Sequence, residues 1–174
     1  ASLNEDDLLS FNNRMVDEDW IVPEEVLTLS TNNSKVNSIN ALNLKNIDDK
    51  EYVYHADIEG KYTGAPVDAE LKIKVGAQVM ITKNDTSYPQ KWVNGTLGII
   101  ESLEGEKIKI KINNRVHYLG KTKWEKIDYR LKGNNISPIP VATFIQYPLK
   151  LAWAATIHKC QGQTFDKVAI DLDT

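Results

Sequence analysis

The sequence has 174 residues, of which 41% are hydrophobic, and a net charge of −3; this suits one domain, with or without an inserted module. No run approaches the roughly 18 apolar residues that span a membrane, and no basic-then-apolar leader opens the chain, so we expect a cytoplasmic protein without a membrane partner. The single cysteine, Cys160, excludes an internal disulfide and a zinc site built from cysteines.

Charge is distributed unevenly along the chain. Residues 1–60 carry 4 basic and 13 acidic side chains, whereas residues 61–132 carry 14 basic and 8 acidic ones. Because phosphates respond to local rather than average charge, the middle of the chain suits a nucleic acid. We expect the acidic N-terminal third to face solvent or another domain.

The N-terminal third predicts half of a parallel α/β unit. Acidic residues 4–20 predict a short helix with Leu8, Leu9 and Phe11 inward, and residues 17–19 a solvated charge run. Residues 25–30 are typical of a buried strand. A helix capped by Thr31 or Asn32 then follows. Its apolar side chains approximate one face: Val36, Ile39, Leu42 and Leu44.

The middle of the chain predicts antiparallel strands. Residues 51–60 alternate in polarity and end in a glycine, and residues 71–85 predict two strands broken by a glycine. In residues 107–112 isoleucines alternate with lysines, between turns at Glu104-Gly105 and Asn113-Asn114. We expect residues 95–130 to form a small inserted barrel or meander, and residues 131–140, rich in turn formers, to be the linker back.

Several catalytic signatures are missing from the sequence. It contains no G-x-x-x-x-G-K-[ST] phosphate loop and no strand that ends in a paired acidic Mg²⁺ site. The three histidines, His55, His117 and His158, have no metal-ligand spacing, so we expect no metal site. Cys160 follows His158 closely, but no third orienting group is identifiable, which favours a buried thiol over a nucleophile.

A polar cluster interrupts two apolar strands near the end of the sequence. Its members are Thr156, His158, Lys159, Gln161 and Gln163. A strand followed by a helical turn at Thr156 presents backbone N–H groups that suit a phosphate. The alternative is structural: Thr156 caps a short helix, His158 lies on the surface, and Gly162 ends the helix.

Three stretches resemble superfamily 1 helicases, in the order that the family has them. TIHKCQGQTFD (156–166) resembles motif five of the petite-integration-frequency and RecD-like branch, with Cys160 where serine is usual. Residues 29–44 resemble motif four. Residues 75–100 resemble the Gly-x-x-Val-Met…Asn-Asp…Asn-Gly-x-x-Gly segment that leads into the family's inserted barrel.

The resemblance implies a fold class and domain boundaries. The fold is α/β: a partial RecA-like parallel sheet (the second domain of a P-loop NTPase) with an inserted small antiparallel Src-homology-like β-barrel. Residues 1–94 form the first part of the RecA-like domain, residues 95–132 the barrel, and residues 133–174 the return, which stops before motif six. The first RecA-like domain of the same chain is an implied partner.

The resemblance also implies the roles of site residues. Thr156 and His158 would contact the backbone of single-stranded DNA, with Lys159 as an electrostatic supplement and Thr31 and Asn32 as weaker candidates. Gln161 and Gly162 would sense the γ-phosphate. The parent would be an ATP-dependent helicase of 5′ to 3′ polarity that uses ATP and Mg²⁺. This chain alone lacks the phosphate loop, the acidic pair and the arginine finger, so we expect it to bind neither cofactor and to be inactive alone.

Two other functions remain open from the residues. The chain is either a stand-alone nucleic-acid or protein-binding module, in which the lysine face of residues 107–111 does the work, or a structural α/β domain without a ligand. Three aromatic side chains either stack on bases or pack internally: Tyr88, Trp92 and Trp124.

Overall fold

The computed structural model describes residues 9–10, 12–16, 20–132 and 135–172. Leu8, Phe11 and the charge run 17–19 of the predicted N-terminal helix lie outside these residues. The predicted inward position of Leu9 is wrong, because its side chain is 60% exposed. No helix in the described ranges is both long and apolar enough to cross a membrane.

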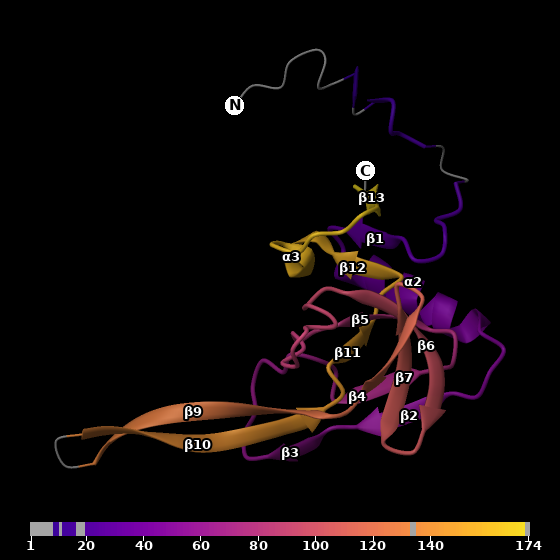
Figure 1. Ribbon diagram of the computed structural model, residues 1–174. Coiled ribbons are helices and arrows are strands. Elements are labelled where there is room, and N and C mark those ends of the chain that lie inside the picture. Colours follow the sequence, from indigo (N-terminus) through magenta and orange to yellow (C-terminus); the bar gives the residue numbers. More distant parts are fainter. Residues whose placement is uncertain (1–8, 11, 17–19, 133–134, 173–174) are drawn as a thin grey trace.

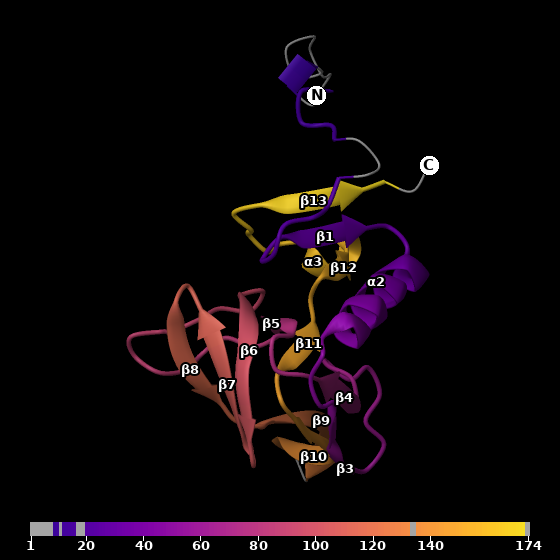
Figure 2. The ribbon, with the colours of Figure 1, turned by 90° about the vertical axis from the view of Figure 1, so that its right-hand side faces the viewer.

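A three-stranded parallel sheet joins the two ends of the described chain (Figures 1 and 2). Its central strand is β1 (Leu27–Ser30), between β12 (Ala154–Thr156) and β13 (Val168–Asp171). In this register Ser30 lies beside both Thr156 and Asp171. Helix α2 (Asn33–Asn46) follows β1, which confirms the predicted strand-then-helix unit. The carboxyl ends of all three strands therefore meet at one edge, near the start of α2.

Helix α2 begins where the sequence predicts but buries a different face. Asn32 is the N-cap, and its Oδ1 accepts hydrogen bonds from Ser34 N at 2.8 Å and Lys35 N at 3.4 Å. Val36 and Leu44 are buried, whereas Leu42 is 59% exposed, so its predicted inward position is wrong.

Asn40 occupies the position between Val36 and Leu44 on the buried side of α2. Its Nδ2 donates to Ala154 O and its Oδ1 accepts from Ala154 N, both at 2.9 Å. A polar side chain thus fixes this face of the helix to the edge of β12. The spacing of apolar residues alone does not predict such a contact.

The middle of the chain forms the predicted strands. β2 (Tyr52–His55) pairs with β4 (Glu70–Ile73), and β3 (Asp57–Glu59) ends at Gly60 with φ +70°. Gly76, with φ +85°, separates β4 from β5 (Gln78–Ile81). The two strands separated by a glycine are confirmed, whereas the single strand predicted over residues 51–60 is two strands, β2 and β3, that pair in different sheets.

A five-stranded antiparallel sheet carries most of the core. Its order is β11-β5-β6-β7-β8, with β6 (Leu97–Glu104), β7 (Lys107–Ile112), β8 (Arg115–Leu119) and β11 (Leu149–Leu151). The isoleucines of β7 are buried, as its alternation predicts, and the turn before β8 places Asn113 and Asn114 at positive φ. The predicted barrel is not closed, because β8 and β11 are opposite edges of this sheet.

A long hairpin replaces the predicted linker. β9 (Thr122–Lys132) pairs with β10 (Asn135–Gln146) and projects from the body as an arm (Figure 1). The linker prediction for residues 131–140 is therefore wrong. β3 pairs only with residues 143–145 of β10, so Pro138 and Pro140 lie at an edge of the described sheet, where a missing N–H is tolerated.

Two core clusters connect the sheets. The larger lies over the five-stranded sheet, and the smaller contains Leu27, Met80, Ala152, Ala155 and Cys160. Met80 belongs to β5, so this smaller cluster packs the parallel sheet onto the five-stranded sheet.

Buried Gln78 of β5 adds polar contacts to this junction. Its Nε2 donates to Ala152 O at 2.8 Å and to Val26 O at 3.3 Å, and its Oε1 accepts from Glu25 N. The residues that follow β12 are therefore positioned by this packed and hydrogen-bonded junction between the two sheets.

Candidate functional site

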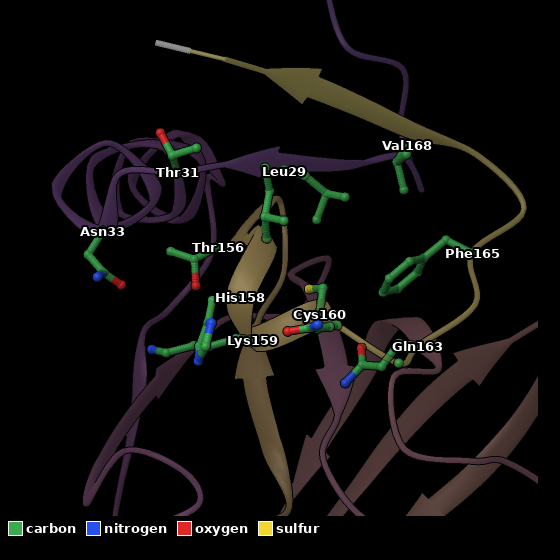
Figure 3. Close-up of a pocket in the computed structure, with 13 residues that line it drawn as sticks. Leu29, Thr31, Asn33, Thr156, His158, Lys159, Cys160, Gln163, Phe165 and Val168 are labelled. Atoms are coloured by element: carbon green, nitrogen blue, oxygen red, sulfur yellow. The ribbon is translucent and has the colours of Figure 1, made fainter. Parts of the chain in front are cut away.

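A hollow of about 860 Å³ opens at the carboxyl ends of β1 and β12 (Figure 3). It gathers six of the seven predicted site residues on its wall: Thr31, Thr156, His158, Lys159, Gln161 and Gly162. Asn32 is not on this wall, because its side-chain oxygen caps α2. The sequence did not indicate five other lining residues as part of a site: Leu29, Asn33, Ile157, Phe165 and Val168.

Thr156 ends β12 at the floor of the hollow. It is only 6% exposed, and it precedes α3 (Ile157–Cys160) without making a side-chain capping hydrogen bond. Thr156 is the N-cap residue of α3, as the structural alternative predicts, but its hydroxyl donates or accepts no capping hydrogen bond. The sequence also predicted a phosphate site at the N-terminus of this helix. A four-residue helix sums few peptide dipoles, so the positive partial charge at its N-terminus is small.

His158 and Lys159 are exposed and project to the same side of the hollow, beneath Asn33 (Figure 3). Gln163 and Phe165 lie at the opposite end in this view. The hollow thus has a polar, cationic side and a side with an aromatic ring.

The segment after α3 turns sharply. Gln161 is the C-cap, Gly162 has φ +81°, and Gln163 N donates to Cys160 O at 3.1 Å. A glycine in this left-handed conformation just beyond the C-cap is the usual way to end a helix. Gly162 ends the helix as predicted, at the position just beyond the C-cap, and it also lines the hollow.

Cys160 anchors α3 from below. Its side chain is 6% exposed within the smaller core cluster, which confirms the predicted buried thiol. Burial raises the pKa of this thiol, and the charge of nearby Lys150 only partly opposes the shift. A protonated, buried thiol is a poor nucleophile. It serves instead to hold the exposed residues of α3 over the core.

The Asn94-Gly95 turn touches the hollow from the other sheet. Gly95 has φ +95°, and a Cβ placed on it would lie 2.7 Å from Gln163 Oε1. That oxygen is buried and has no hydrogen-bond partner among the described residues. In the sequence Asn94-Gly95 belongs to the Asn-Gly-x-x-Gly segment, and nothing local to it indicates that Gln163, between α3 and β13, is its neighbour.

The described residues contain no group of three or more His, Cys, Asp or Glu side chains that could hold a metal ion. The hollow itself offers hydroxyl, imidazole, ammonium and amide groups. This set of donors suits phosphate oxygens, and it lacks the carboxylates that Mg²⁺ prefers.

No protein-family model matches the sequence. The ATP-dependent DNA helicase Pif1 of Bdellovibrio bacteriovorus is 33% identical over 152 residues, which are 79% of this chain and 32% of the relative. The structure of unliganded Pif1 from Bacteroides sp. has 34% identity and a TM-score of 0.86, over 97% of this chain and 39% of that one. The chain belongs with the Pif1-like helicases. Its similarity is to their C-terminal region, which confirms the resemblance carried by the three motifs.

A further Pif1 structure, Bacteroides Pif1 bound to ssDNA, is 34% identical with a TM-score of 0.74 and covers 97% of this chain and 39% of that one. The chain spans about a third of the length of the curated Pif1 relatives it matches. The similarity therefore establishes the mixed α/β fold and the family.

Proposed function

We propose that this chain is the part of an ATP-dependent DNA helicase that grips single-stranded DNA and links it to the ATP cleft. In this proposal the parallel sheet belongs to a second RecA-like domain, and residues 95–132, which include β6, β7 and β8 of the five-stranded sheet, form its inserted Src-homology-like module. The observation that carries the proposal is the hollow that gathers Thr31, Thr156 and His158 with Gln161 and Gly162. The Pif1 structure with bound ssDNA supports the choice of ligand.

The phosphate contacts come from two strand ends. The Thr156 hydroxyl and the His158 ring donate hydrogen bonds to phosphate oxygens, and Lys159 adds charge at the exposed rim. Thr31, at the end of β1, faces the same hollow. Asn32 contributes by fixing the first turn of α2, beside the strand.

Coupling to ATP runs through α3. Gln161 and Gly162 directly follow the short helix that carries His158 and Lys159, so a movement of the γ-phosphate displaces the DNA-binding residues directly. Cys160 lies between the proposed DNA-binding residues and the proposed nucleotide-sensing residues, and its buried side chain holds this point of the chain in place. Opening and closing of the cleft against the first RecA-like domain then moves the strand, with 5′ to 3′ polarity.

ATP and Mg²⁺ act in the whole protein in this proposal. The described residues offer no carboxylate cluster for Mg²⁺, and the sequence contains no phosphate loop. No step therefore runs through a metal ion held by this chain. We propose that the chain alone hydrolyses no ATP and unwinds no duplex.

The test is a fluorescence-anisotropy titration in which this chain is added to labelled oligothymidylate at two salt concentrations. We expect Thr156→Ala/His158→Ala to weaken binding by about thirtyfold, because the double variant loses two hydrogen bonds to phosphate oxygens that each contribute on the order of 1 kcal/mol. Asn37→Ala/Ser38→Ala, at exposed positions of α2, is the control. If the double variant keeps the native circular-dichroism spectrum and its affinity is unchanged, Thr156 and His158 do not bind the DNA backbone.

The second candidate, a module that binds through the lysine face of β7, has one observation in its favour: Lys107 and Lys111 are exposed. Lys109 between them is paired with Glu104 at 3.0 Å, which neutralises the centre of that face. Loss of binding in Lys107→Ala/Lys111→Ala, with the α3 variant unaffected, would favour this candidate instead.

A further inference from the structure

The outer half of the β9–β10 arm is amphipathic along β9. Ile127, Tyr129 and Leu131 are 46%, 68% and 76% exposed, and they share one face of the strand. Asp128 and Arg130 alternate with them on the other face, where Arg130 Nε lies 3.4 Å from Asp128 Oδ2. A ribbon of two strands is marginally stable in water by itself, and a further strand stabilises it. The arm therefore suits a partner strand.

The two long edges of the arm differ in their capacity to accept another strand. The outer edge of β10 carries Pro138 and Pro140, and prolines at an edge protect a sheet against further pairing. β9 contains no proline and no glycine, and among the described strands it pairs only with β10. The open edge of the arm is therefore that of β9.

The register of the arm determines which backbone groups lie at the open edge. Pro138 is the partner of Tyr129, and Pro140 is the partner of Ile127. A proline has no N–H to donate to β9, so both prolines occupy non-hydrogen-bonded positions of the antiparallel ladder. At such positions both partners direct their N–H and C=O groups away from each other. Tyr129 and Ile127, and by the same alternation Leu131, therefore present these groups at the open edge of β9.

We propose that the open edge of β9 pairs antiparallel with the same edge of a second copy of this chain, about a two-fold axis through Tyr129. In this register Tyr129 lies opposite Tyr129 of the second copy, and Ile127 lies opposite the second copy's Leu131. These positions carry outward N–H and C=O groups in both strands, so each pair exchanges both of its backbone hydrogen bonds. The apolar side chains of the two strands also pack against each other across the junction.

The charges of β9 select this register. Asp128 lies opposite the second copy's Arg130 on both sides of the axis, at non-hydrogen-bonded positions where the side chains of an antiparallel pair come closest. An axis moved by one residue would place Asp128 or Arg130 opposite its own copy, with like charges together. An axis between two residues would place apolar side chains opposite charged ones. Only the axis through Tyr129 avoids both conflicts within residues 127–131.

The shape of the chain permits this contact. The arm projects from the body, so antiparallel arms place the two bodies at opposite ends of the paired strands (Figure 1). The contact is small, because it involves residues 127–131 of each copy, and small interfaces belong to weak complexes. We therefore expect a dissociation constant in the micromolar range. The inference does not depend on the proposed DNA grip, whose residues lie at the other sheet.

The test is sedimentation velocity of the full-length protein that carries this chain, from about 1 to about 100 μM, a range that brackets weak association. We expect a dimer that forms as the concentration rises. Asp128→Arg and Arg130→Asp should each weaken it at least about tenfold, because each places like charges opposite each other. An equal mixture of the two variants should dimerise again, because one copy then carries only positive groups at these positions and the other only negative ones.

A second variant tests the backbone pairing. Tyr129→Pro removes an N–H group that points away from β10, so the arm keeps its own ladder while the centre of the proposed junction loses its hydrogen bonds. We expect this variant to be monomeric up to about 100 μM, the upper limit of the same concentration series. Tyr129→Phe keeps the N–H group and the ring, so it should dimerise like the wild type. Circular dichroism checks that every variant is folded.

Three outcomes would contradict the inference. A wild type that stays monomeric throughout shows that β9 does not pair with a second copy. A dimer that survives Tyr129→Pro forms through another surface. If each charge variant is monomeric and their mixture is monomeric too, the proposed register is wrong. Binding of oligothymidylate is measured separately, and Tyr129→Pro should leave it unchanged, so failure of the DNA grip and failure of the dimer are distinguishable.

Discussion

Gln163 lies so close to Gly95 that a Cβ on the glycine would be 2.7 Å from Gln163 Oε1. Gly95 belongs to the loop before β6, and Gln163 follows α3, so this contact joins the five-stranded sheet to the wall of the α3 hollow. Real Cβ atoms essentially never approach another heavy atom so closely, and the positive φ of Gly95 adds backbone strain for any other residue.

Gly95→Ala should therefore destabilise the protein by about 2–3 kcal/mol, from left-handed strain plus steric clash. Gly64→Ala is the matched control: Gly64 also has positive φ, but nothing lies within 4 Å of its Cβ position. Chemical denaturation should show that the control lowers the free energy of unfolding by only about 1 kcal/mol. Equal costs at the two positions would mean that the Gln163 contact does not constrain the fold.

Asn40→Ala should destabilise the protein by about 2 kcal/mol, because it removes two hydrogen bonds to the backbone of Ala154 and the groups they satisfy are part-buried. The measurement is the midpoint of urea unfolding at constant m-value. Asn37→Ala, on the exposed side of the same helix, should change stability by less than about 0.5 kcal/mol. Asn40→Leu, which restores an apolar face, should rescue nothing if the hydrogen bonds matter.

Cys160 should make stability fall at alkaline pH. Burial raises the pKa of its thiol above the ordinary value of 9.0, so the folded state holds the proton more tightly than the unfolded state. This contribution is complete below pH 9 and is lost as pH rises from there through the folded pKa.

Denaturation of the wild type and of Cys160→Ala should thus be compared between about pH 7 and about pH 10.5, a window that brackets the ordinary thiol pKa. The difference in unfolding free energy between the two should shrink as pH rises, since only the wild type must keep a thiol protonated. A difference that stays constant with pH would contradict the assigned burial.

Local patterns of the sequence predicted the parts of this fold that depend on neighbouring residues. The period of two in β7 placed its isoleucines inward, and Asn113-Asn114 formed its turn, because alternation and turn conformation are properties of a few adjacent residues. The order of Thr156, His158 and Gln161 around one short helix was likewise readable from the motif.

Other features depended on contacts between distant residues. Leu42 is exposed because Asn40 reaches Ala154, 114 positions away, and so sets the rotation of the helix. Residues 131–140 contain the glycine, asparagines and prolines of a linker, yet strand pairing with β9 and a free edge made most of them a strand.

The family, the strand-and-helix unit and most site residues could be predicted from the amino-acid sequence, because short motifs carry their chemistry in adjacent positions. Three features came only from the three-dimensional structure: the five-stranded sheet is open, Thr31 and Thr156 line one hollow, and Gly95 packs against Gln163. Each of these is a packing of segments far apart in the chain. Such packing is selected by the burial of a shared core, which no local pattern specifies.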